Sequence, residues 1–158
     1  MIRPGQKLKT DFTLRVVQDN EVKEVKLSDL LTRRTIVSVY MRNNTGGCDK
    51  QNDSLAAHAK EFKQAGYTLI AVSRDTPGSH QKYAAKKGIS YILASDPDDL
   101  FAQATDSIIE KSMYGRKFTG PARAAYVLVK DGTVLAVAEK VDTADHANQL
   151  RELIATIK

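Results

Sequence analysis

Several features that would each point to a class of protein are missing from this sequence. It has a single cysteine, Cys48, among 158 residues, so no disulfide can form within the chain. No apolar run approaches the roughly 18 residues of a membrane-spanning helix, and the first residues lack the apolar core of a secretory signal. We therefore expect a cytoplasmic protein that keeps its thiol reduced and contacts no membrane.

Motifs that bind metals or cofactors are also missing. There is no Cys-x-x-Cys pair, which excludes a dithiol reductase of the thioredoxin type, and no glycine-rich phosphate loop. His58, His80 and His146 lie far apart, and none has metal-ligand spacing with Cys48. We expect His80 to be a surface residue in the first turn of a helix. The aspartates within residues 96–99 are better explained by helix capping, so no metal and no cofactor is expected.

The formal net charge of +5 raises the question of a nucleic-acid partner. Basic residues are interleaved with acidic ones along the chain, and the densest pairs, Arg33-Arg34 and Lys86-Lys87, are short. There is no basic helix and no cluster of aromatic residues for base stacking. We interpret the charge as a solvated basic surface and expect no nucleic-acid partner.

Hydrophobic periodicity predicts strands that alternate with helices. The expected elements are a hairpin over 15–27 with its turn at 19–20, a helical turn at 28–31, strands at 35–40, 67–73 and 91–94, helices at 48–65, 76–88 and 96–104, a hairpin over 124–138, and a helix at 143–157. Residues 106–122 are expected to be irregular. This order predicts one α/β domain over residues 1–158, with a mixed sheet flanked by helices and an N-terminal hairpin.

Cys48 occupies a special place in this pattern. It follows an apolar run and a polar, glycine-containing turn, and it begins a helix whose inward face carries Leu55, Ala59 and Phe62. Unpaired backbone N–H groups and the helix dipole favour a thiolate at such a position. A reactive nucleophile is therefore the first hypothesis, although a lone cysteine is more often an inert buried residue.

The order and spacing of several short strings resemble the Q-type peroxiredoxins, also called bacterioferritin comigratory proteins, which have a thioredoxin-like fold. The strings lie at 11–14, 27–30, 45–48 with Gln51, 71–75, 93–97, 113–115, 120–123 and 131–132. The resemblance implies a thiol-dependent peroxidase that reduces hydrogen peroxide and organic hydroperoxides. It places the peroxidatic cysteine at Cys48, the family threonine at Thr45 and the family arginine at Arg123.

These residues have expected roles and simpler alternatives. Arg123 would stabilise the thiolate and the peroxide oxygens, Thr45 would exchange hydrogen bonds through its hydroxyl, and the backbone N–H groups of Gly47 and Cys48 would face a bound oxygen. Alternatively, Thr45 is only a helix N-cap, and Arg123 is a surface residue at a strand edge.

Three positions depart from the family pattern. Met41 and Gly46 replace two prolines, and Asp53 stands where many members carry a resolving cysteine. The sulfenic acid at Cys48 would then need an external thiol, such as glutathione with glutaredoxin, or thioredoxin. A monomer or weak homodimer is expected. The alternative function is a thioredoxin-fold module for redox sensing or interaction that has lost peroxidase turnover.

Overall fold

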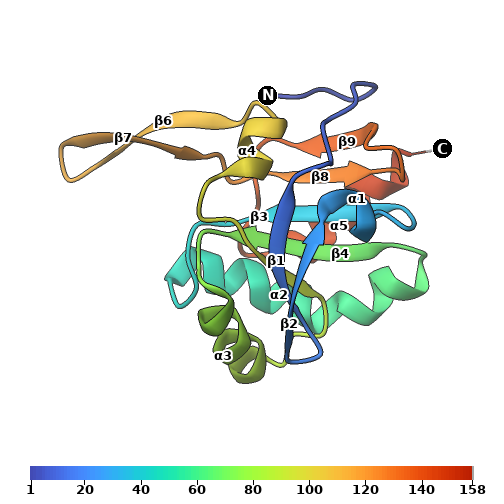
Figure 1. Cartoon of the computed structure of the whole chain (residues 1–158), viewed down its shortest axis with the longest axis horizontal. Coiled ribbons are helices and arrows are strands. Elements are labelled where there is room, and N and C mark those ends of the chain that lie inside the picture. Colours follow the sequence, from blue (N-terminus) through green and yellow to red (C-terminus); the bar gives the residue numbers. More distant parts are fainter. Residues whose placement is uncertain (158) are drawn as a thin grey trace.

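The structure, a computed structural model, describes residues 1–157. Seven strands form one mixed sheet at its centre (Figure 1): β1 (Thr13–Gln18), β2 (Glu21–Lys26), β3 (Thr35–Val39), β4 (Thr68–Ser73), β5 (Ile92–Ser95), β8 (Ala125–Leu128) and β9 (Val134–Ala138). Their order across the sheet is β2-β1-β5-β4-β3-β8-β9. β3, β4 and β5 pair in parallel and all other pairs are antiparallel. The predicted mixed sheet and N-terminal hairpin are confirmed.

Helices cover both faces of this sheet. Over residues 1–157 the helices are α1 (Leu27–Leu30), α2 (Gly46–Gln64), α3 (Pro77–Lys87), α4 (Leu100–Ala104) and α5 (His146–Ala155). Side chains of α2, α3 and α5 pack into the hydrophobic core on one face, and α1 and α4 contribute to the core on the other. In the part of the chain that the structure describes, no helix is long and apolar enough to cross a membrane.

β3 explains why the candidate site lies where it does. All five of its residues are buried, and alternate side chains enter opposite core layers, with Ile36 on the α2 side and Val37 on the other. A strand buried on both faces reads as a nearly continuous apolar run, as observed here. Thr35 at the start of the strand and Ser38 are its polar residues. Ser38 is again on the α2 side, and its hydroxyl contacts Gln51 of α2.

The ends of α2 and α3 follow their sequence signals. The chain after α2 turns at Gly66, whose φ of 93° suits glycine. Thr76 caps α3 by accepting a hydrogen bond from the Ser79 backbone N–H at 3.2 Å, and Pro77 occupies the first position. Gly88 ends α3 in the left-handed conformation.

The last helix begins later than predicted. The pattern places its start at Thr143, whereas α5 begins at His146. The carboxylate of Asp142 accepts hydrogen bonds from the backbone N–H groups of Ala144 at 3.1 Å and Asp145 at 3.3 Å. This local turn competes with helix formation and delays the first helical residue.

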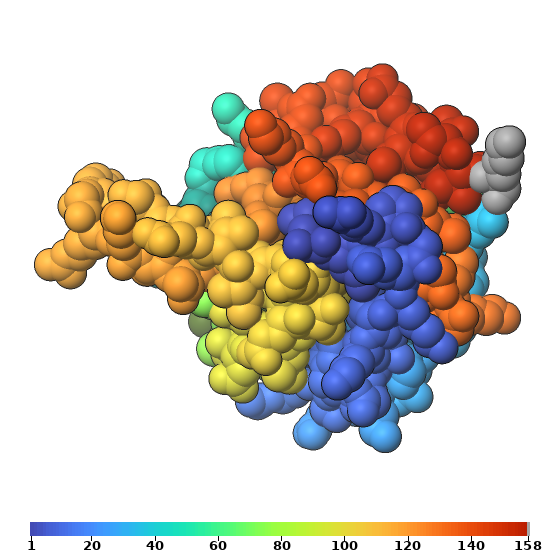
Figure 2. All heavy atoms as spheres, turned by 90° about the horizontal axis from the view of Figure 1, so that it is seen from above, coloured from blue at the N-terminus to red at the C-terminus, as the bar shows by residue number. Residues whose placement is uncertain are grey.

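The prediction that residues 106–122 are irregular is wrong. They contain a second, two-stranded sheet, β6 (Ile108–Met113) paired antiparallel with β7 (Arg116–Pro121). The turn between them uses Tyr114 and Gly115, with φ of 53° and 76°. This hairpin stands out from the body of the molecule (Figures 1 and 2). Most of its side chains are exposed, so it lacks the alternation by which a half-buried strand is recognised.

The expectation that His80 lies on the surface is also wrong. His80 is in the first turn of α3 as predicted, but its side chain is fully buried. Its ring nitrogens lie 3.2 Å from the carbonyl oxygen of Ala94 and 3.2 Å from the side-chain nitrogen of Asn43. Burial lowers the pKa of His80. The residue is thus a hydrogen-bonded core histidine.

Candidate active site

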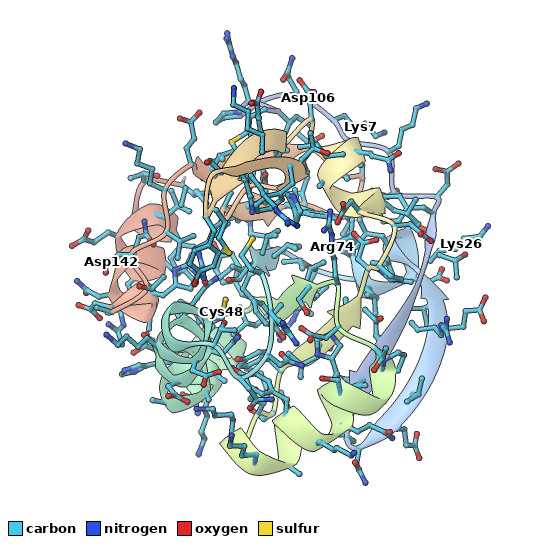
Figure 3. All side chains as sticks on the ribbon, turned by 90° about the vertical axis from the view of Figure 1, so that its left-hand side faces the viewer. Lys7, Lys26, Cys48, Arg74, Asp106 and Asp142 are labelled. Carbon is cyan, nitrogen blue, oxygen red and sulfur yellow. The ribbon has the colours of Figure 1, made fainter. Side chains whose placement is uncertain are left out.

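Cys48 lies in the first turn of α2, beneath a cavity of about 700 Å³. Figure 3 looks at this region from the side on which the hairpin projects. The cavity is lined by Met41, Arg42, Thr45, Gly47, Cys48, Arg74, Asp75, Lys111, Met113, Phe118, Gly120, Pro121 and Arg123. Cys48 itself is 1% exposed, so its sulfur is reached through this cavity. All the site residues that the sequence predicted therefore line one cavity.

The surroundings of Cys48 favour the thiolate. Burial by itself raises the pKa of the thiol. Hydrogen bonds from the Thr45 side chain and from the backbone amides of Arg42 and Met41 lower it, and so does the positive charge of Arg123. The lowering effects prevail, and the pKa of Cys48 lies below its ordinary value.

Thr45 faces the thiol and does not act as a side-chain cap. It occupies the N-cap position, where its backbone carbonyl accepts from Asp49 N–H at 2.7 Å, but its hydroxyl makes no capping bond. The hydroxyl instead donates to the carbonyl oxygen of Arg42 at 2.8 Å. The same hydroxyl is within hydrogen-bond reach of the Cys48 thiol, and this hydrogen bond lowers the pKa of Cys48.

Arg123 is half-buried and is oriented by an uncharged partner. It precedes β8, and its Nη1 donates to Oε1 of Gln51 at 2.7 Å. Its Nη2 lies 3.8 Å from where a β-carbon on Gly47 would stand, so the guanidinium lies close above the start of α2. Because Gln51 is neutral, the hydrogen bond fixes the guanidinium without cancelling its charge.

The hairpin supplies a wall that the sequence pattern did not predict. β6 contributes Lys111 and Met113, and β7 contributes Phe118. The ammonium of Lys111 lies 2.6 Å from the sulfur of Met41, and burial, with the charges of Arg123 and Arg74, lowers its pKa. The wall was missed because residues 106–122 were expected to be irregular.

Two further cationic side chains, Arg74 and Lys111, lie beside the cavity near Gly120. A β-carbon there would stand 3.6 Å from Nη2 of Arg74, whose Nε donates to Asp99 at 2.8 Å. Arg74 is therefore neutralised by its own carboxylate, whereas Lys111 has no carboxylate partner in the described part of the chain. Within residues 1–157, no group of three or more histidine, cysteine or acidic side chains is placed to hold a metal ion.

The chain matches the family model described as AhpC/TSA family over residues 4–137. The chain belongs to this family. Peroxiredoxin Bcp of Xanthomonas campestris pv. campestris is 35% identical over 113 residues, which are 72% of this chain and 71% of that protein. Peroxiredoxin Bcp of Escherichia coli K12 is 28% identical over 128 residues, 81% of this chain and 82% of that protein.

Similar solved structures come from the same family as the relatives found by sequence. Peroxiredoxin Q of X. campestris is similar with a TM-score of 0.83 and 30% identity, covering 96% of this chain and 98% of that one. A second structure is of the X. campestris bacterioferritin comigratory protein, studied for its alkyl peroxide reduction activity. It has a TM-score of 0.83 and 29% identity, covering 96% of this chain and 98% of that one. The predicted family, thioredoxin-like fold and enzyme class, a peroxiredoxin, are confirmed.

Proposed function

We propose that Cys48 is the peroxidatic cysteine and that it reduces hydrogen peroxide and organic hydroperoxides. The thiolate attacks one peroxide oxygen; the S–O bond forms as the O–O bond breaks, and hydroxide or alkoxide leaves and takes up a proton. Cys48 becomes a sulfenic acid. The observation that carries this proposal is the convergence of Cys48, Thr45 and Arg123 on one cavity.

Lowering the thiol pKa cannot by itself make a fast peroxidase. A fall from about 8.5 to about 6 raises the thiolate fraction at neutral pH roughly 30-fold. With a Brønsted slope near 0.4–0.5, the same fall lowers the nucleophilicity of each thiolate roughly 10- to 18-fold. The two effects nearly cancel, so catalysis must come from alignment of the O–O bond and stabilisation of the leaving oxygen.

The cavity supplies groups for both tasks. Arg123 carries a permanent charge and several N–H donors that face the peroxide oxygens. The N–H groups of Gly47 and Cys48 belong to the first turn of α2, where no earlier carbonyl accepts them, so they bind a peroxide oxygen. Thr45 donates its hydroxyl proton to the thiolate.

An external thiol completes the cycle. Asp53, at the position of the family's resolving cysteine, is exposed and its carboxylate lies 3.1 Å from the ammonium of Lys87, whereas Cys48 is buried. The sulfenic acid therefore reacts with glutathione followed by glutaredoxin, or with thioredoxin. The chain works as a monomer or weak homodimer within the cytoplasm.

Stoichiometric peroxide added to the reduced protein tests the proposal. We expect mass spectrometry to find a sulfenic acid at Cys48 within seconds, and Cys48→Ser to fold normally but consume no peroxide. Equal consumption by the variant and the parent, after metal removal, would refute the peroxidatic role. Oxidation of Cys48 without turnover when thiol is supplied would instead favour the alternative, a redox-sensing or interaction module.

A further inference from the structure

A chain of hydrogen-bonded polar side chains connects Arg123 to the first turn of α5. Nη1 of Arg123 lies 2.7 Å from Oε1 of Gln51, whose Nε2 lies 2.8 Å from Oγ of Ser38. The same Oγ lies 2.9 Å from Nε2 of His146, and Nδ1 of His146 lies 3.0 Å from Oε1 of Gln149. Gln51, Ser38 and His146 are all fully buried. The two central links, Gln51–Ser38 and Ser38–His146, are therefore shielded from competing water.

Gln149, at the outer end of this series of side chains, sets the direction of the hydrogen bonds. The side-chain nitrogen of Gln149 donates to the carbonyl oxygen of Lys140 at 2.6 Å, and its Oε1 accepts from Asp142 N–H at 2.9 Å. Oε1 must therefore face His146, which places the proton of that ring on Nδ1. Nε2 of His146 is left as a bare acceptor.

Because Nε2 of His146 can only accept, it determines the hydrogen-bond directions of Ser38 and Gln51. The hydroxyl of Ser38 donates its proton to His146, so its oxygen is free to accept from Gln51. Nε2 of Gln51 also donates to the carbonyl oxygen of Val39 at 3.3 Å. The amide oxygen of Gln51 is thereby turned toward the guanidinium of Arg123.

The opposite tautomer of His146 would reverse this order. A proton on Nε2 would point at Ser38, and the hydroxyl of Ser38 would then donate toward Gln51. The amide of Gln51 would be drawn to turn its oxygen to Ser38 and its NH₂ group to Arg123, where two donors repel. Burial lowers the pKa of His146, so the ring stays neutral. The Oε1 acceptor of Gln149 then keeps the single ring proton on Nδ1.

We infer that His146 is a positioning residue for Arg123, acting through Ser38 and Gln51 to hold the guanidinium over Cys48. The inference rests on the proposed role of Arg123 in peroxide reduction. It assigns a task to a helix, α5, that contributes no residue to the cavity lining. It also explains why the one polar side chain that β3 turns toward α2 is a serine.

The first test is independent of peroxide. In His146→Leu the acceptor is lost, and we expect the side-chain amide signals of Gln51 to shift in NMR spectra and the guanidinium protons of Arg123 to exchange faster with water. His146→Gln places an amide near the position of Nε2 and should restore much of both signals. Unmoved signals in folded His146→Leu would overturn the inference whether or not the protein consumes peroxide.

The second test uses the rate at which peroxide oxidises Cys48. His146→Leu and Ser38→Ala should each lower this rate roughly two- to tenfold, the range of one hydrogen bond. In the Arg123→Met background the same changes should have no further effect. A loss of equal size in both backgrounds would mean that His146 acts on the fold alone, and the inference would fall.

The matched control is Ser54→Ala. Oγ of Ser54 accepts from Ala147 N–H at 2.9 Å, so this variant also loses an α2–α5 hydrogen bond at the start of α5 but leaves the chain to Arg123 intact. We expect its oxidation rate to stay close to that of the parent. If Ser54→Ala slowed the reaction as much as His146→Leu, general loosening of α5 would explain both, which contradicts a specific role for His146.

Discussion

The pairing of Arg123 with the amide of Gln51 leaves the positive charge of the guanidinium uncompensated at the cavity. A carboxylate at position 51 would bind the guanidinium more strongly but would place a negative charge beside the thiolate. Gln51 accepts one hydrogen bond from Arg123 at 2.7 Å and leaves the other donors of the guanidinium for substrate. The arrangement gives orientation without neutralisation, which a peroxide-reducing site needs because negative charge develops on the leaving oxygen.

Replacing Arg123 with methionine separates the two effects of its charge. We expect Arg123→Met to raise the pKa of Cys48 and, in addition, to lower the oxidation rate per thiolate by about a hundredfold, the cost of a lost donor to a developing oxyanion. Thiolate absorbance measured against pH, alongside the rate, gives the two quantities. An unchanged rate per thiolate would show that Arg123 does not act on the leaving oxygen.

Gly46 stands in place of a family proline, and we expect that restoring proline there would increase the stability of the fold. It is the first residue of α2, and no atom outside its neighbours lies within 4 Å of a β-carbon built on it. Thr45 before it is extended, with φ of −123° and ψ of 147°, as a residue before proline requires. Gly46→Pro should therefore stabilise the fold by about 0.4–1 kcal/mol.

Chemical denaturation measures this difference, and position 66 provides the control. Gly66 has a φ of 93°, which proline cannot adopt, so Gly66→Pro should destabilise the protein. A Gly46→Pro variant less stable than the parent would show that the turn before α2 does not suit proline, and that the departure from the family reflects a changed backbone.

At the scale of elements, the sequence predicted best the parts that are buried in the core. The strand at 35–40 was evident from its nearly continuous apolar run, because both of its faces are buried. The inward stripe of α2 was evident because burial of one face imposes a helical period on the apolar residues. The β6–β7 hairpin was missed because its residues from 108 to 119 are almost all exposed and its turn, Tyr114-Gly115, is not a common hairpin pair. His80 was misplaced because one polar residue in a first turn does not reveal which way that turn faces.

The place of the β6–β7 hairpin in the cavity wall leads to a prediction about bulky substrates. Phe118 of β7 lines the cavity and is 42% exposed, so it offers an apolar contact that hydrogen peroxide is too small to use. We expect Phe118→Ser to lower the ratio of oxidation rates with cumene hydroperoxide and hydrogen peroxide about fivefold, the effect of a partly buried aromatic contact.

Ile109 of β6 gives the matched control for that experiment. It lies in the same hairpin and is 45% exposed, but it is not part of the cavity lining. Ile109→Ser should leave the ratio near that of the parent. If both variants changed the ratio equally, the hairpin would act through its overall stability, and the cavity wall would not be the place where the organic group binds.

At the scale of the molecule, the sheet places the reacting thiol and its partners on different segments. Cys48 comes from the helix after β3, Arg123 precedes β8, and β3 and β8 are neighbours in the sheet. Sequence order alone leaves these residues 75 positions apart, since 123 less 48 is 75. Only the antiparallel pairing of β3 with β8 brings them to one edge of the sheet, which a chain pattern without a family resemblance does not reveal.

The same geometry supports the proposed reduction by an external thiol. Positions 48 and 53 are five residues apart on one helix, which separates them by about 140° around its axis. Cys48 accordingly points into the core while Asp53 is exposed. Without added thiol, the protein should consume about one peroxide per chain and then stop as sulfenic acid, over-oxidise, or link two chains through Cys48.

Glutathione should restore turnover and leave a mixed disulfide on Cys48, detectable by mass spectrometry and released by glutaredoxin. In Asp53→Cys, an internal disulfide would require the first turns of α2 to unwind, because the two sulfurs leave different faces of the helix. That variant should therefore form its disulfide only with increased hydrogen exchange at the start of α2. Sustained turnover of the parent with no thiol added would refute the external reductant, since the chain contains no second cysteine to resolve Cys48.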